Sequence, residues 1–164
     1  MNDEKGQLSG EYMLLVGSLI VVLMISIFMI ANENELNIAM AAAKSGADEG
    51  VASSSSAIYP KETFNEYDDM EGLKHPYSVS IVNVSYNSSG IDENYEKQKI
   101  QFKVYAKASA DYNKKELDSI GDRINYNLRK SVATSFNTTD STNKLYNPVF
   151  SNNYVFTTAN VVWV

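Results

Sequence analysis

The chain has 164 residues, with 20 acidic and 14 basic side chains, a formal net charge of −6 and no cysteine. This length allows one small domain plus an anchor. An acidic chain without a basic cluster is a poor candidate for nucleic-acid binding, which depends on neutralising phosphates. The lack of cysteine excludes a disulfide framework, a thiolate metal site and a cysteine nucleophile.

A short charged leader precedes a long uncharged run at the N-terminus. Residues 12–31 carry no charge, and about 20 apolar residues in a helix cross the ~30 Å hydrocarbon core of a bilayer. An ordinary secretory signal is cut after its apolar run, behind small residues, but here residues 32–35 read Asn-Glu-Asn-Glu. The sequence therefore predicts a cut before the run, at Gly6, which keeps the anchor in the mature protein.

The junction between leader and anchor combines several features in a fixed register. Lys5 and Gly6 precede Gln7, Glu11 occupies the fifth position after the predicted cut, and Tyr12 opens the apolar run. At these residues the chain resembles an archaeal type IV pilin with a class III signal peptide, of the Gln-type group of methanogens. The resemblance covers roughly residues 5–50 and does not extend to the rest of the chain.

This resemblance implies a life cycle and a role for Glu11. A prepilin peptidase would cut between Gly6 and Gln7, and a pilus assembly platform would move the subunit from the cell membrane into an extracellular filament for adhesion or surface attachment. The N-terminal helices would join the subunits into a helical homopolymer, and Glu11 would pair with a neighbouring subunit's N-terminal amine. Two alternatives stay open: Gln7 can cyclise to a neutral lactam, and Glu11 can simply lie in the headgroup zone, favoured by the helix dipole.

No proline interrupts residues 32–57, which follow the apolar run. Spacings of three or four predict one apolar stripe along this second half of a long helix, formed by Leu36, Met40, Ala43, Ala47 and Val51. The stripe is narrow and built of small residues, which suits packing on a partner, and we expect neighbouring subunits to cover it. Gly46 and Gly50 weaken the helix toward its end, and Tyr59-Pro60 terminates it.

The remaining sequence predicts a small head. Residues 60–76 read as a polar connection, residues 77–86 and 99–108 alternate as strands, and residues 87–90 supply turn residues between them. The second strand places Ile100, Phe102, Val104, Ala106 and Ala108 on one face. Residues 114–135 return to helical spacing, and residues 153–158 and 160–164 read as short strands, the last tucked into the sheet.

The predicted fold class is α+β: a long N-terminal helix, membrane-spanning in its first half, followed by a head with an antiparallel β-hairpin or sheet and one amphipathic helix. The expected organisation is a cleaved leader at 1–6, the hydrophobic-to-amphipathic helix at 7–58 and an extracellular head at 59–164.

The sequence holds three acceptor patterns for N-glycosylation, at Asn83, Asn87 and Asn137. Accessibility favours Asn87 and Asn137, which lie at or near predicted turns, over Asn83, which falls in a predicted strand. Use of these sites would make the protein a glycoprotein.

No pattern of catalytic, metal-binding or cofactor-binding residues is found, so we expect neither an enzyme nor a cofactor. The leading hypothesis is a structural prepilin subunit. The alternatives are a minor pilin or pseudopilin of a secretion or tip complex, and a single-pass membrane-tethered surface protein that never polymerises.

Overall fold

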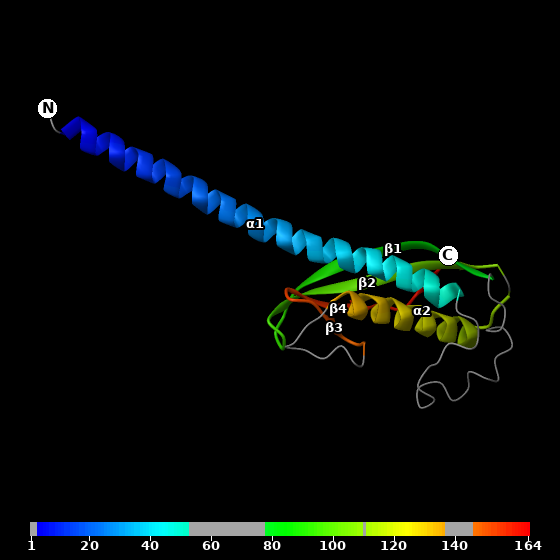
Figure 1. Ribbon diagram of the computed structural model, residues 1–164. Helices are drawn as coiled ribbons and strands as arrows, with labels where there is room; N and C mark the ends of the chain where they lie inside the picture. Colours follow the sequence, from blue (N-terminus) through cyan, green and yellow to red (C-terminus); the bar gives the residue numbers. More distant parts are fainter. Residues whose placement is uncertain (1–2, 53–77, 110, 137–145) are drawn as a thin grey trace. The chain divides into compact units, whose positions relative to one another are not determined.

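The computed structural model describes residues 3–52, 78–109, 111–136 and 146–164, with side chains from residue 10 onward (Figure 1). The chain divides into two compact units, Met1–Leu36 and Asn37–Val164, and their boundary falls within helix α1, Asp3–Ala52. A small mixed sheet and a second helix follow α1, which confirms the predicted α+β class. The predicted helix end and the polar connection at 60–76 lie outside the described residues.

The sheet of the second unit is built around one central strand. Its strands are β1 Val79–Asp92, β2 Lys97–Ala108, β3 Val149–Phe150, β4 Tyr154–Thr158 and β5 Val162–Trp163. They run in the order β1-β2-β4-β3, with β5 also paired to β2. β1 pairs with β2 in the antiparallel sense, as the sequence predicts, whereas β4 and β5 both lie parallel to β2. The C-terminal residues therefore join the sheet, and the Val164 N–H donates to the Ala106 carbonyl at 2.9 Å.

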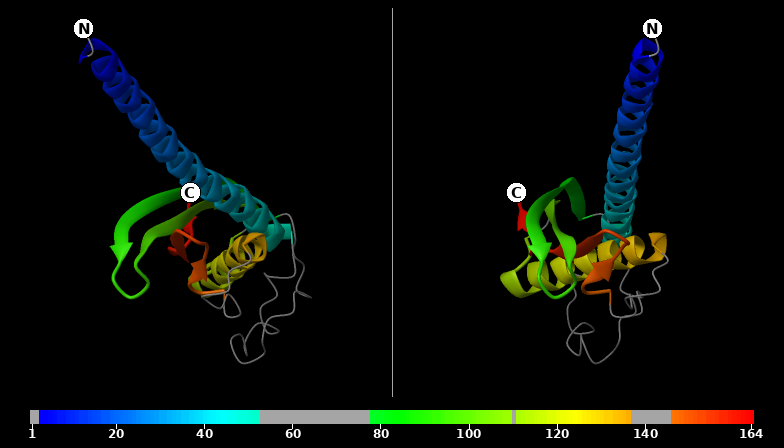
Figure 2. Two further views of the ribbon diagram at one scale, coloured as in Figure 1. Left: turned by 60° about the vertical axis from the view of Figure 1, so that its left-hand side comes forward. Right: turned by 90° about the vertical axis from the view of Figure 1, so that its left-hand side faces the viewer.

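The turn expected at residues 87–90 is wrong, because β1 runs through them to Asp92. These residues instead form an irregularity in the pairing between Ser88 and Ile91, where Gly90 has a φ of 83°. Glycine adopts this left-handed conformation at little cost, and it is typical of a β-bulge. Figure 2 shows the two long strands of the hairpin curving together.

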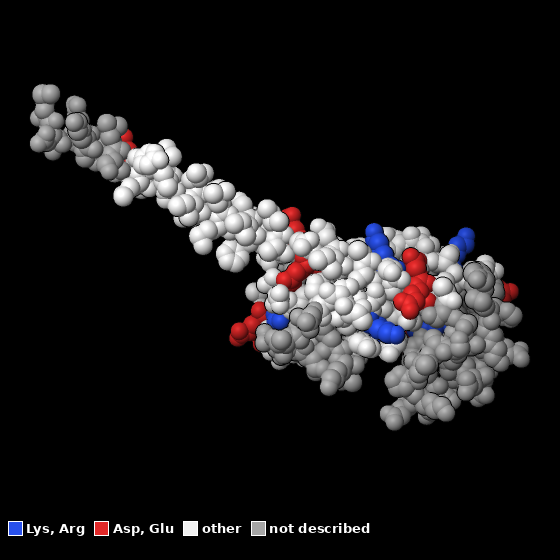
Figure 3. Space-filling view, viewed as in Figure 1, with Lys and Arg blue, Asp and Glu red and all other residues white. Residues whose placement is uncertain are grey.

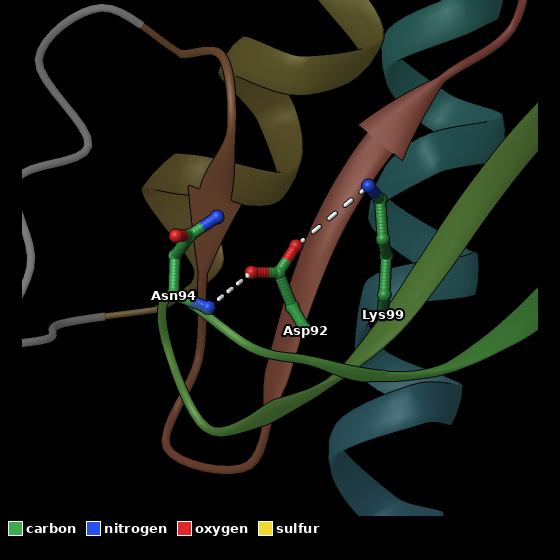
Figure 4. Close-up of polar contacts among 3 residues, drawn as sticks. All are labelled: Asp92, Asn94 and Lys99. Atoms are coloured by element: carbon green, nitrogen blue, oxygen red, sulfur yellow. Dashed lines mark hydrogen bonds and ion pairs between the residues drawn. The ribbon is translucent and has the colours of Figure 1, made fainter.

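The actual turn occupies residues 93–96 and is closed by side chains as well as backbone. The Asp92 Oδ1 atom accepts the Asn94 N–H at 3.0 Å, and Oδ2 lies 3.7 Å from the Lys99 Nζ atom (Figure 4). The Glu96 N–H donates to the Asp92 carbonyl at 2.8 Å. The hairpin loop is therefore short, and Asp92 is the residue that organises it.

A second irregularity in the pairing changes which residues of β1 face the core. The pairing with β2 shifts between Ile81 and Asn83, so that Val84, and not Asn83, lies opposite Val104. Val84 is 3% exposed and Val82 is 58% exposed. One extra residue in a strand reverses the alternation beyond it. Alternation counted from Val79 therefore misassigns Val84, which it places on the same outward face as Val82.

Helix α2, Lys114–Ser135, has the bounds that the sequence predicts. It begins at a capping box, in which the Asn113 side chain accepts the Glu116 N–H at 3.0 Å and the Glu116 carboxylate accepts the Asn113 N–H at 2.9 Å. Its apolar side packs on the sheet (Figure 1). The core is formed by Ile120, Ile124, Leu128 and Val132 of α2 with Ile100, Phe102, Val104 and Ala106 of β2.

The C-terminal part of α1, which belongs to the same unit, packs closely against α2. A Cβ placed on Gly46 would lie 2.5 Å from the Asn127 backbone oxygen and 2.7 Å from the Ser131 Cβ, distances that real Cβ atoms do not show. A Cβ on Gly50 would lie 2.8 Å from the Ile124 Cα. The two glycines thus permit a close crossing of helices, a role that the sequence analysis did not assign to them.

The buried stripe of this part of α1 is formed by Ala39, Ala43, Gly46, Ala47 and Gly50. Ala43 and Ala47 belong to the predicted stripe, but Leu36, Met40 and Val51 are only half-buried. Since Ala43 and Ala47 are fully buried within one chain, the expectation that neighbouring subunits cover them is wrong.

Candidate functional site

The predicted processing junction lies near the beginning of α1. The backbone of Lys5, Gly6 and Gln7 is helical, because α1 begins at Asp3. Helix ends fray, and glycine has the lowest helix propensity apart from proline. The bond between Gly6 and Gln7 therefore lies near a helix end and beside a residue of low helix propensity.

The Glu11 side chain is exposed on α1, one helical turn beyond Gln7. Residues four apart lie on the same face of a helix. A carboxylate at this position therefore lies one helical turn along α1 from the backbone of Gln7. It also immediately precedes the apolar segment that opens at Tyr12.

The apolar segment after Glu11 is exposed along its length. From Tyr12 to Ile30, the large apolar side chains other than Val16 are between 51% and 76% exposed. Figure 3 shows this part of α1 as an uncharged surface on the face it presents. By length and composition, the helix from Gly10 to Ala52 contains a stretch apolar enough to cross a membrane, a criterion that a signal sequence near an N-terminus also meets.

The hydroxyl groups in this segment bond to their own helix. The Ser18 Oγ atom donates to the Leu15 carbonyl and the Ser26 Oγ atom to the Val22 carbonyl, both at 2.8 Å. In hydrocarbon an unsatisfied polar group is costly. Because both hydroxyls are already satisfied, the serines do not oppose transfer of the segment into an apolar environment.

The two described glycosylation candidates lie on one strand. Asn83 and Asn87 are both exposed on β1, opposite Tyr105 and Gln101 of β2. The predicted distinction between them therefore disappears, since Asn87 is in a strand like Asn83 and both are accessible. Asn137 lies outside the described residues.

A groove of about 380 Å³ lies where the first turns of α2 meet the C-terminal strand segment. Its apolar lining comes from Leu117, Val161 and Trp163. Gly121 is buried beneath it, where an added Cβ would lie 3.4 Å from the Val161 Cβ and 4.0 Å from the Trp163 ring. The glycine thus leaves room for the groove between the helix and the C-terminal residues.

The polar lining of the groove comes from Lys114, Asp118, Asp122, Asn125 and Asn160. Asn125 is only 6% exposed, and its Nδ2 atom donates to the Ala159 carbonyl at 3.0 Å. This hydrogen bond fixes the amide orientation, because a flipped amide would place two acceptors against each other. The Asn125 Oδ1 atom has no hydrogen-bond partner among the described residues.

The charges beside the groove influence one another. Burial raises the pKa of the Asp122 carboxyl above its ordinary value of 3.8; Arg129 opposes this shift and Asp118 adds to it. Burial also lowers the pKa of the Arg129 guanidinium, against the effects of Asp122 and Tyr126. The Arg129 side chain donates to the Thr158 hydroxyl at 2.5 Å. The carboxylate of Asp122 is therefore less well solvated than a freely exposed one.

The sequence analysis missed this groove. Asp118 and Asp122 are four residues apart on a predicted helix, which places both carboxylates on one face. That spacing was a usable signal, and residues 160–164 were predicted to join the sheet, but nothing in the sequence shows that Asn160 and Trp163 lie beside the first turns of α2. The chain matches no family model, no curated protein and no solved structure.

Proposed function

We propose that the chain is the precursor of a structural subunit of an archaeal type IV pilus-like surface filament. The observation that carries this proposal is the exposed, uncharged surface of α1 after Glu11, where the large apolar side chains of 12–30 other than Val16 are more than half exposed. Such a surface is costly in water. It requires cover from lipid before assembly and from neighbouring copies of the same helix afterwards.

The junction residues support the processing step of this proposal. Prepilin peptidase removes residues 1–6 by cutting after Gly6, and the new N-terminus at Gln7 lies one helical turn from Glu11. A carboxylate and an ammonium that are both removed from water stabilise each other, whereas either one alone is expensive to bury. Glu11 then favours the addition of a subunit whose N-terminal amine can form an ion pair with it.

Processing is tested by the intact mass of the protein isolated from an archaeal host that has the peptidase. We expect a mature mass that lacks residues 1–6, and we expect Gly6→Val to retain the full-length mass. Gly10→Val is the control, because nothing lies within 4 Å of a Cβ placed on Gly10. A wild-type protein that keeps its leader would overturn the proposal and leave a membrane-tethered surface protein. The same mass spectrum shows whether Gln7 has cyclised and whether the sequons carry glycans.

Assembly is tested by counting filaments sheared from cells that express each variant as the only copy. We expect Glu11→Ala to reduce their number at least on the order of tenfold, the effect of losing about 1.4 kcal/mol per contact. Glu33→Ala is the control, since Glu33 is also an exposed carboxylate on α1 but lies beyond the apolar run. Normal filament numbers for Glu11→Ala would remove the assembly role of this residue. A processed subunit found only in trace amounts in the filaments would indicate a minor pilin or pseudopilin.

A further inference from the structure

We propose that the groove between α2 and the C-terminal residues binds a neutral pyranose sugar unit of a glycan. This inference concerns the second compact unit alone and does not depend on whether the subunits polymerise. The groove has a volume of about 380 Å³, at the lower end of the roughly 300–1,000 Å³ typical of small-molecule sites. Its size therefore suits a single sugar unit better than an extended ligand.

The lining combines an aromatic side chain with hydrogen-bonding groups. Trp163 provides apolar area together with an indole N–H, and Leu117 and Val161 extend the apolar part. A pyranose ring has C–H groups on its faces and hydroxyls around its edge. It can therefore pack on the apolar side chains while its hydroxyls reach the polar ones.

The polar groups offer more acceptors than donors. The carboxylates of Asp118 and Asp122 only accept when ionised, and Asn160 can do both. The Asn125 Oδ1 atom is buried and not accessible from the groove, so the acceptors considered for a ligand are those of Asp118, Asp122 and Asn160. A ligand rich in hydroxyl donors matches this set of groups.

Other ligand classes fit the groove less well. A phosphate or carboxylate ligand would be repelled by Asp118 and Asp122. An ammonium ligand would be attracted by Asp118 and Asp122 and repelled by Lys114, which lines the same groove. Among the described residues, no group of three or more histidines, cysteines or acidic residues is placed to hold a metal ion. A neutral ligand is therefore favoured over an anion, and an organic cation is the competing ligand that the test must include.

The test uses a property of the chain itself: Trp163 is its only tryptophan. Trp163 fluorescence of the full chain, kept in a zwitterionic detergent without a sugar headgroup, is titrated with methyl β-D-glucopyranoside, methyl β-D-galactopyranoside and N-acetyl-D-glucosamine. We expect a saturable change with at least one of them. Sorbitol, which has similar hydroxyls but no ring, and ethylammonium serve as the polyol and cation controls.

Variants then locate the site. Asp118→Ala and Asn160→Ala should each weaken binding on the order of tenfold, the effect of leaving one hydrogen-bond partner unsatisfied. Asp48→Ala should leave it unchanged, because Asp48 is exposed on α1 and does not line the groove. Circular dichroism checks that each variant is folded. Asp118→Asn, which keeps the side-chain shape, replaces the alanine variant if that one does not fold, with the same direction expected.

Three results would overturn the proposal. The first is the absence of a saturable change with all three sugars while the wild-type chain is folded. The second is an equal response to sorbitol, which would indicate a general effect of polyols on the indole. The third is saturation by ethylammonium alone, which would make the groove a cation site. None of these results bears on processing or on filament number, so this proposal and the filament proposal can fail separately.

Discussion

The first and second parts of helix α1 have different apolar surfaces. From Tyr12 to Ile30 its apolar side chains are mostly large and exposed, whereas between Asn37 and Ala52 its buried positions are all alanine or glycine. The difference is one of side-chain size more than of polarity. Small residues allow another helix to approach closely, so the chain itself covers them, while the large residues require cover from outside the chain.

A hydropathy profile does not distinguish the apolar surface of the first part of α1 from that of the second part. The stripe with Ala43 and Ala47 contributes to the core of the second unit, and its glycines lie against the backbone of α2. The first part of α1 has no such arrangement. The buried stripe of the second part is therefore not available to lipid or to other subunits, and changes in the two parts should have different consequences.

The largest effect should come from filling the closest contact of the second part. Gly46→Leu places side-chain atoms where even a Cβ would lie 2.5 Å from the Asn127 backbone oxygen. Overpacking of this kind costs typically 1–3 kcal/mol and sometimes more, and we expect about 3 kcal/mol or more because backbone cannot yield easily. Thermal unfolding followed by circular dichroism measures it.

Gly17→Leu is the matched control for this change, since nothing lies within 4 Å of a Cβ on Gly17. It should leave the midpoint of unfolding unchanged. Equal loss of stability in both variants would show that the contrast between the two parts of α1 is wrong.

The next largest effect should come from a change in the exposed first part of α1, which leaves the head intact. Leu23→Lys introduces a charge near the middle of the apolar segment, at a cost of about 2.5–3.5 kcal/mol on insertion scales. We expect the variant to lose its resistance to extraction from membranes by alkaline carbonate. Ala41→Lys, at an exposed position of the second part, should stay in the membrane fraction. Loss of both variants from that fraction would contradict the difference between the first and second parts of α1.

A smaller effect is expected from a change in the head alone. Asn113→Ala removes the N-cap of α2 and should lower the free energy of unfolding by about 1 kcal/mol, with no change in the membrane fraction. Asn113→Ser keeps an acceptor at the cap and should recover most of the loss. Urea unfolding of the three proteins measures this, and an alanine variant as stable as wild type would show that the capping box adds nothing.

The smallest effect is a pH dependence confined to the head. Because the pKa of Asp122 is raised in the folded chain, ionisation of this carboxyl is less favourable there than in the unfolded chain. Its contribution to stability is fully present below the ordinary value of 3.8 and is lost as the pH rises through the raised pKa.

Asp122→Asn lacks this titration. Relative to the variant, the wild type should therefore lose free energy of unfolding as the pH rises from below that value to neutrality. A difference between the two proteins that stays constant, or that changes in the opposite direction, would contradict the assignment. The membrane fraction of both should be the same at every pH.

Local patterns predicted the elements better than their pairing. The alternation along β2 and the helical spacing of α2 are each carried by one uninterrupted segment, and both were predicted correctly. The bulges of β1 depend on how it fits β2, so the exposed Val82 and the buried Val84 could not be told apart by alternation alone. The role of Gly46 and the groove at Trp163 involve segments far apart in the chain, for which the sequence holds no local signal.

The two serines that bond within α1 have a mechanical consequence for the proposed filament. With Ser18 and Ser26 satisfied by their own helix, neighbouring helices in a bundle would meet through oily, non-directional contacts. The strength of such contacts would depend on how closely the large side chains of neighbouring helices interdigitate. The proposed filament would therefore be sensitive to the size of these side chains and not to hydrogen bonds of Ser18 or Ser26.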